Sequence, residues 1–153
     1  MVVQVVTQPA QRVAAVSHRG PYQQIGEAFM RLDRIARESG LDKLQGIALV
    51  GIFHDNPAVV PADQLRAEAG LVVPAAAALP SSLTEVTIPA GRYARTEHRG
   101  PYERLGDTWT RLRDWLPASG HRMRDGASYE QYKNTPAQVA PADLRTDLYL
   151  PVE

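Results

Sequence analysis

Two stretches of the chain carry apolar side chains at the three- and four-residue spacing of an amphipathic helix. Each stretch follows a Gly-Pro pair and ends at a glycine, at Gly40 and at Gly120. Proline is tolerated at the first helical position, and glycine commonly ends a helix in the left-handed conformation. The pattern therefore predicts two helices that each bury one stripe. The apolar positions are Ile25, Phe29, Leu32, Ile35 and Ala36 in the first stretch and Leu105, Trp109, Leu112, Trp115 and Leu116 in the second.

The segments around these helices are short, rich in β-branched or aromatic residues, and bounded by turn-forming residues, as is typical of strands. One strand leads into each helix and two follow it, and two more are predicted around Pro9 and Pro89. The predicted segments are 13–17, 46–53 and 65–73 in the first half and 93–97, 126–132 and 144–152 in the second. The sum is an α+β fold with mostly antiparallel sheets, two main helices laid against them and a central cleft.

The two halves of the chain are copies of one unit. The pentapeptide HRGPY occurs at 18–22 and again at 98–102, and residues 12–41 match residues 92–121 at twelve of thirty positions without a gap. Residues 54–66 echo residues 133–145. A repeat on this scale indicates a tandem duplication of a strand-helix-strand-strand unit. We expect a single domain, 1–153, made of repeats 1–73 and 84–153 with a linker at 74–83.

The HRGPY pentapeptide is best interpreted as the corner between a strand and a helix. Its histidines, His18 and His98, are expected to satisfy neighbouring backbone groups or solvent. The remaining histidines, His54 and His121, have no convincing metal-ligand spacing to them. We therefore predict no metal.

Composition excludes several classes of protein. Lys+Arg and Asp+Glu are both 17, so the chain has no global positive charge with which to hold nucleic acid, and we expect no direct nucleic-acid binding. The absence of cysteine rules out disulfides and thiolate chemistry. The N-terminus does not resemble a signal peptide, and the apolar run around Pro74 is too short to span a membrane. We expect a cytoplasmic protein with no cofactor.

The informative positions are those at which the two copies differ. When the halves are aligned through Pro57 and Pro136, Gly51 falls opposite Glu130, and Phe53 falls opposite Tyr132. If this strand is central, Glu130 points into a largely apolar interior, where an unpaired carboxylate costs several kcal/mol. A carboxylate that faces the space left by Gly51 predicts a pocket for a cationic aromatic ligand. Its candidate walls are Phe53, Trp109, Trp115 and Tyr132.

Simpler interpretations remain open at this point. Glu130 could lie on the solvent-exposed face of an edge strand, or it could pair with an arginine. Trp109 and Trp115 stand at helical spacing and could be core residues. The arginines of the second helix, Arg104, Arg111 and Arg113, could form a solvated face.

The chain resembles the GyrI-like family along nearly its whole length. The resemblance is carried by HDNPAVVPADQLR, by YEQYKNTPAQVAPADLRTDLYLPV and by the GPY corner of each half. The family includes the effector-binding domains of AraC-type and MerR-type multidrug regulators and stand-alone gyrase-inhibitory proteins. The regulators carry a helix-turn-helix domain ahead of this one. The chain starts with its first strand, so it would be either a stand-alone member or a piece of a longer regulator.

The resemblance implies a ligand site in the cleft between the two halves. It also implies that a glutamate in an E-x-Y or E-x-F setting, here Glu130 with Tyr132, contacts the cationic part of the ligand. Trp109, Phe53 and Tyr149 are further candidates by position.

Three functions follow, and they belong to different classes. The first is a module that binds small cationic, aromatic molecules, either as an effector-binding domain or to sequester them. The second is a hydrolase of reactive small molecules, in which Glu130 would be the acid–base residue, helped by Tyr132. The third is a protein-interaction module with DNA gyrase or a regulator as partner, in which Glu130 would not matter.

Overall fold

The computed structural model describes residues 1–153 and confirms an α+β fold with two main helices and antiparallel strands. The chain separates into two compact units, which we describe one at a time. The N-terminal unit is Ala10–Pro89, and the C-terminal unit combines Met1–Pro9 with Ala90–Glu153. No helix is both long and apolar enough to cross a membrane.

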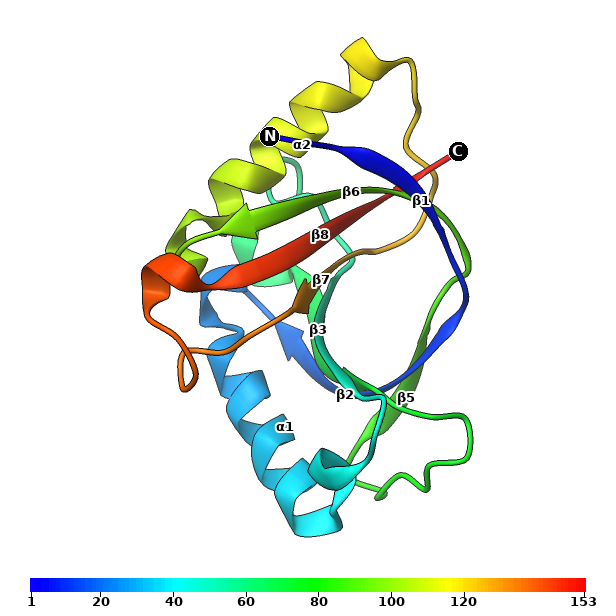
Figure 1. Ribbon diagram of the computed structural model, residues 1–153, viewed down its shortest axis with the longest axis vertical. Helices are drawn as coiled ribbons and strands as arrows, with labels where there is room; N and C mark the ends of the chain where they lie inside the picture. Colours follow the sequence, from blue (N-terminus) through cyan, green and yellow to red (C-terminus); the bar gives the residue numbers. More distant parts are fainter. The chain divides into compact units, whose positions relative to one another are not determined.

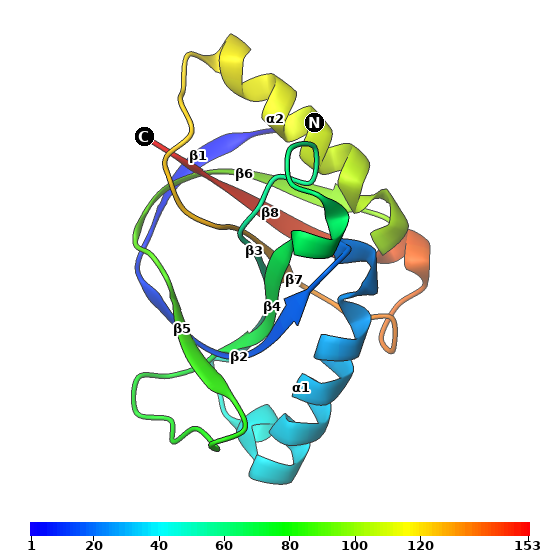
Figure 2. The same cartoon turned by 180° about the vertical axis from the view of Figure 1, so that it is seen from behind.

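The N-terminal unit has four antiparallel strands in the order β3-β4-β2-β5 and one long helix. In chain order its elements are β2 (Gln11–Arg19), α1 (Gly26–Ser39), β3 (Ala48–Phe53), β4 (Arg66–Val72) and β5 (Thr84–Ile88). Figure 2 shows α1 running along β2 and β4. Leu32 and Ala36 of the predicted stripe are buried on Ala14 and Ala69, together with Ala28, which was not predicted. The other predicted positions, Ile25, Phe29 and Ile35, are partly buried against the same cluster.

The C-terminal unit repeats this plan with the strand order β1-β6-β8-β7. Its elements are β1 (Gln4–Gln8), β6 (Gly91–Arg99), α2 (Leu105–Ser119), β7 (Ser128–Tyr132) and β8 (Arg145–Val152). The side of this sheet that faces α2 carries Ala94, Leu148, Leu150 and Val152. These pack against the helix residues Leu105, Trp109, Leu112 and Leu116.

The structural units and the sequence repeats have different boundaries. Strand β1 comes from the start of the chain but pairs with β6, and Figure 1 shows the blue β1 beside the green β6. Strand β5 pairs in turn with β2. Pro9-Ala10 and Pro89-Ala90 explain why neither strand forms a hairpin with the one after it. Tight two-residue hairpins need positive φ angles, and proline is fixed near −65°.

The two HRGPY corners have the same structure. Gly20 and Gly100 have φ angles of 126° and 127°, where a side chain would be strained. The ring nitrogens Nε2 of His18 and His98 lie 3.0 and 3.1 Å from the carbonyl oxygens of Pro21 and Pro101. The expectation that these histidines satisfy the local backbone is confirmed.

The helices begin later than the Gly-Pro pairs predicted. A 3-10 turn, Tyr22–Gln24 or Tyr102–Arg104, comes between the proline and each α-helix. The predicted helix ends are confirmed, because Gly40 and Gly120 are left-handed with φ angles of 82° and 78°.

The core of the N-terminal unit yields a stability prediction at Gly70. This residue pairs with Ala15 on β2 and with Val50 on β3, and a Cβ added to it would collide with the Val13 side chain, which has no exposed surface. We expect Gly70→Ala to lower the free energy of unfolding by about 1–3 kcal/mol, because overpacked cores must shift. Urea denaturation monitored by circular dichroism would measure the change.

Gly106→Ala is the matched control, because an added Cβ at this helical position would meet no atom within 4 Å. We expect it to be neutral, or stabilising by up to about 1 kcal/mol. Equal effects of the two substitutions would contradict the packing argument.

Candidate functional site

The candidate site lies on the side of the C-terminal sheet that faces α2. Antiparallel register aligns Glu130 on β7 with Leu148 on β8 and Thr96 on β6, so these three side chains share one face. The shared face is the one that packs on α2, since Leu148 lies in the core with Trp109. Glu130 is consequently enclosed, with 4% of its surface exposed.

Two neutral donors hold the Glu130 carboxylate. The indole Nε1–H of Trp109 donates to Oε1 at 2.7 Å, and the hydroxyl of Tyr132 donates to Oε2 at 2.7 Å. No arginine, lysine or histidine forms an ion pair with it. Glu130 is therefore neither solvent-exposed nor neutralised by an arginine, the two alternatives that the sequence left open.

Burial dominates the acid–base behaviour of this group. It raises the pKa of Glu130, and the hydrogen bonds from Trp109 and Tyr132 oppose that rise. Burial and the nearby Glu130 charge also raise the pKa of Tyr132 well above its usual value, and they raise the pKa of Tyr102. Both phenols thus stay protonated at neutral pH, and Tyr132 remains a donor to the carboxylate.

Aromatic rings surround the carboxylate. Tyr102 packs edge-on against Tyr132, with ring centroids 5.6 Å apart. The guanidinium of Arg113, one of the arginines expected on a solvated face, lies 5.6 Å from the centroid of the Trp109 ring. Tyr102 was not among the residues predicted from the sequence. Its signal in the sequence was the repeated HRGPY, which ends in Tyr102 and in the equivalent Tyr22. In the structure Tyr22 likewise packs edge-on, against Phe53 at 4.9 Å.

The other predicted residues lie elsewhere. Tyr149 is on the opposite face of β8 from Leu148, where it stacks on Tyr129 at 4.4 Å. Trp115 stacks on His121 at 5.9 Å. Gly51 and Phe53 belong to β3 of the N-terminal unit, where Gly51 pairs with Ala69. The structure thus brings Glu130, Tyr132 and Trp109 into contact within one unit.

The chemistry open to this arrangement is limited. No three acidic, histidine or cysteine side chains gather where they could coordinate a metal ion. A buried carboxylate among aromatic rings can attract a cation, or it can take up a proton. The residues in contact at this site thus offer a carboxylate and aromatic rings rather than a set of metal ligands.

Fold and site together define an α+β ligand-binding domain built from two similar units. The model of one family, the GyrI-like small molecule binding domain, matches residues 1–153, and the chain belongs to that family.

Curated relatives support the assignment. The chain is 35% identical over 143 residues to a DNA gyrase inhibitor of Serratia proteamaculans (strain 568), with 88% of each chain covered. It is 27% identical over 154 residues to "Probable transcriptional regulator YgiV" of Escherichia coli (strain K12), with 98% of this chain and 95% of the relative covered.

Solved structures share the fold at low sequence identity. The EcmrR C-terminal domain superposes with a TM-score of 0.78 at 17% identity, covering 99% of this chain and 97% of that one. SAV2435 bound to tetraphenylphosphonium superposes with a TM-score of 0.68 at 12% identity, covering 100% and 94%.

The raised pKa of Glu130 predicts how stability depends on pH. Between the unfolded and the folded pKa the native state binds more protons, so stability falls as pH rises through the folded pKa. Glu130→Gln removes this loss while it keeps an acceptor for Trp109 and a polar group for Tyr132. We expect the variant to gain stability relative to the wild type as pH rises from 4 to 8 in urea denaturation. A difference that does not change with pH would contradict the argument.

Glu97 is predicted to behave in the opposite way. Hydrogen bonds from Arg145 and Lys133 lower the pKa of Glu97 to about 2. The stability that Glu97 contributes is present above pH 4.5 and is lost as pH falls toward 2. We expect Glu97→Gln to cost on the order of 1 kcal/mol at pH 7, because water screens this partly exposed group. The cost should vanish near pH 2, and an equal cost at both pH values would be inconsistent with linkage.

Proposed function

We propose that this domain binds small aromatic cations, with Glu130 as the counter-charge and Trp109, Tyr132 and Tyr102 as aromatic contacts. The observation that carries the proposal is the buried Glu130 carboxylate, which has two neutral donors and no cationic partner. A buried charge without a counter-ion costs free energy, and a bound cation would recover part of that cost. The tetraphenylphosphonium bound to SAV2435 is a ligand of this chemical class.

Each residue would have a distinct role. The donors Trp109 and Tyr132 favour the ionised form of Glu130, which prepares the charge before a ligand arrives. The rings offer flat surfaces to an aromatic ligand and a cation–π contact to its charge. Few of these interactions are directional, so we expect the site to accept a range of ligands that share charge and aromaticity rather than one shape.

The place of the site in the whole domain is part of the proposal. The family resemblance puts the ligand between the two halves, which would add Phe53 and Gly51 to its surroundings. Trp115 and Tyr149, whose rings stack on His121 and Tyr129, would have at most an indirect part. In a regulator, binding would shift a conformational equilibrium, and in a stand-alone protein it would sequester the ligand.

A second candidate function rests on the curated relatives. The Serratia proteamaculans relative is a DNA gyrase inhibitor and is similar along 88% of its length. We infer that DNA gyrase is a candidate protein partner of this chain. Gyrase inhibition would use exposed surface, so it should survive the loss of the Glu130 charge, whereas ligand binding should not.

The test is a fluorescence titration with tetraphenylphosphonium in a Trp115→Phe background, where Trp109 is the only tryptophan left to report. We expect saturable quenching, and at least a tenfold weaker Kd in Glu130→Gln, which corresponds to about 1.4 kcal/mol. Affinity for the cation should also fall as pH is lowered, because protonation removes the counter-charge.

Two controls make the outcome specific. Glu97→Gln removes the same charge from a carboxylate already paired with Lys133 and Arg145, and it should leave the Kd unchanged. Neutral triphenylphosphine oxide should bind wild type and Glu130→Gln equally. An unchanged tetraphenylphosphonium Kd in Glu130→Gln would remove Glu130 from the site. Consumption of a ligand at a steady rate would instead support the hydrolase alternative.

A further inference from the structure

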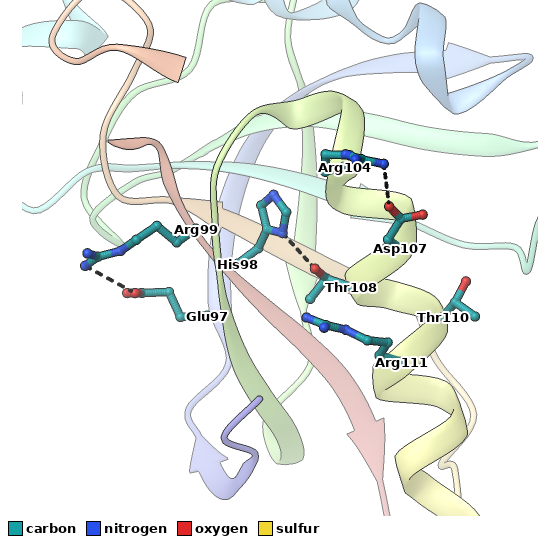
Figure 3. Close-up of a pocket in the computed structure, with 8 residues that line it drawn as sticks. All are labelled: Glu97, His98, Arg99, Arg104, Asp107, Thr108, Thr110 and Arg111. Carbon is teal, nitrogen blue, oxygen red and sulfur yellow. Dashed lines mark hydrogen bonds and ion pairs between the residues drawn. The ribbon is translucent and has the colours of Figure 1, made fainter. Parts of the chain in front are cut away.

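A groove of the C-terminal unit is separate from the Glu130 site. It lies between the end of β6 and the first turns of α2 and has a volume of about 390 Å³ (Figure 3). Strand β1 pairs with β6 only as far as Arg95, so no strand covers the β6 edge from Thr96 to Arg99. The groove lies beside this uncovered end, and its lining includes none of Glu130, Trp109 and Tyr132.

Its lining is rich in arginine. Arg111 extends from α2 toward β6, Arg104 is directed toward Asp107, and the Arg99 guanidinium points away from α2, toward Glu97 (Figure 3). Arg111 makes no hydrogen bond or ion pair with any residue of the chain. The lining has three arginines and two acidic residues, Glu97 and Asp107, whereas the whole chain has zero net charge.

The two carboxylates in the lining, Glu97 and Asp107, pair only weakly with the groove arginines. Glu97 is held at 2.7 Å by both Lys133 and Arg145, and Arg99 reaches it only at 3.9 Å. Asp107 pairs with Arg104 at 3.3 Å, where both side chains are 72% exposed. Exposed pairs of this kind contribute between 0 and about 1 kcal/mol, so either arginine can exchange its partner at little cost.

The polar groups at the base of the groove are already satisfied. Nδ1 of His98 is hydrogen-bonded to the Thr108 hydroxyl at 2.7 Å. Nε2 of the same ring is hydrogen-bonded to the Pro101 carbonyl at 3.1 Å. If Nε2–H donates to that carbonyl, Nδ1 is the acceptor and the Thr108 hydroxyl is the donor. The guanidinium groups are then the donors that the groove can offer to a ligand.

We propose that this groove binds the oxyanion group of a small molecule, a phosphate or a carboxylate, with Arg111 as its principal contact and Arg104 and Arg99 as recruited partners. A guanidinium offers paired N–H donors whose spacing matches two oxygens of one such group. The volume lies within the 300–1,000 Å³ typical of small-molecule sites, so the ligand can be larger than a bare phosphate ion.

The N-terminal unit provides the contrast. In the repeat, Arg111 corresponds to Arg31 on α1, but Gln24 stands in the place of Arg104 and Met30 in that of Thr110. Met30 is 74% exposed. Two of the groove arginines, Arg99 and Arg111, therefore have counterparts in the N-terminal unit, Arg19 and Arg31, whereas Arg104 has no cationic counterpart there. Arg31→Gln is consequently a matched control for Arg111→Gln.

The test is an NMR titration of the full chain with phenyl phosphate, benzoate and neutral benzamide at constant ionic strength. We expect saturable shifts of the Arg111 Nε–H and Thr108 amide signals with phenyl phosphate or benzoate, and none with benzamide. Which of the two anions binds more tightly identifies the oxyanion. Arg111→Gln combined with Arg104→Gln should weaken Kd at least tenfold, and Arg31→Gln should not change it.

Non-saturable shifts, or equal weakening in Arg31→Gln and in the double variant, would overturn the proposal, because either outcome means general charge screening. All substituted arginines are exposed, so the variants are expected to fold. The same titration of Glu130→Gln should match the wild type, which keeps this result independent of the cation site.

Discussion

The burial of one carboxylate constrains the C-terminal unit more than any other single contact described for it. Glu130 sits between the C-terminal sheet and α2, and its two oxygens accept hydrogen bonds from Trp109 and Tyr132 at 2.7 Å each. Neutral donors reduce the cost of burying a charge, but they do not cancel it. The buried charge therefore lowers stability, and such groups in an otherwise apolar layer are candidates for functional sites. The packing of α2 on this sheet fixes the Trp109 indole where it can make its bond.

Duplication explains how such a group could be accommodated. The N-terminal unit uses the same face for packing alone, with Gly51 and Phe53 where the C-terminal unit has Glu130 and Tyr132. The aromatic pair of the corner is preserved in both units, as Tyr22 with Phe53 and as Tyr102 with Tyr132. The change from Phe53 to Tyr132 adds a single hydroxyl, and that hydroxyl is the second donor to Glu130. The two copies thus share one scaffold, and the C-terminal copy carries a carboxylate and a hydroxyl where the N-terminal copy has neither.

Much of this could be predicted from the sequence, because it is encoded locally. Helical spacing located the stripes of α1 and α2, and Gly40 and Gly120 located their ends. Comparison of the two copies identified Glu130. The pairing of β1 with β6 could not be predicted, because the alternation of apolar and polar residues shows which face of a strand is buried but not which strand it pairs with. The same limit applies to Tyr149, whose face relative to Glu130 depends on the register between β7 and β8. Tyr102 was missed because the 3-10 turn that holds it has no periodic pattern.

Glu97 and Glu130 show how one unit treats two carboxylates in opposite ways. Glu97 lies near the surface and is neutralised by Arg145 and Lys133, so its pKa falls. Glu130 is surrounded by rings and receives no cation from the chain, so its pKa rises. The unit is not short of cations, because Arg113 lies over the ring of Trp109, whose indole nitrogen binds Glu130. If Glu130 were paired with such an arginine, its charge would already be neutralised. The carboxylate would then have little attraction left for a cation from solution. The absence of an ion pair between Glu130 and any arginine or lysine is thus the condition on which the proposed cation site rests, and a purely structural ion pair would not meet it.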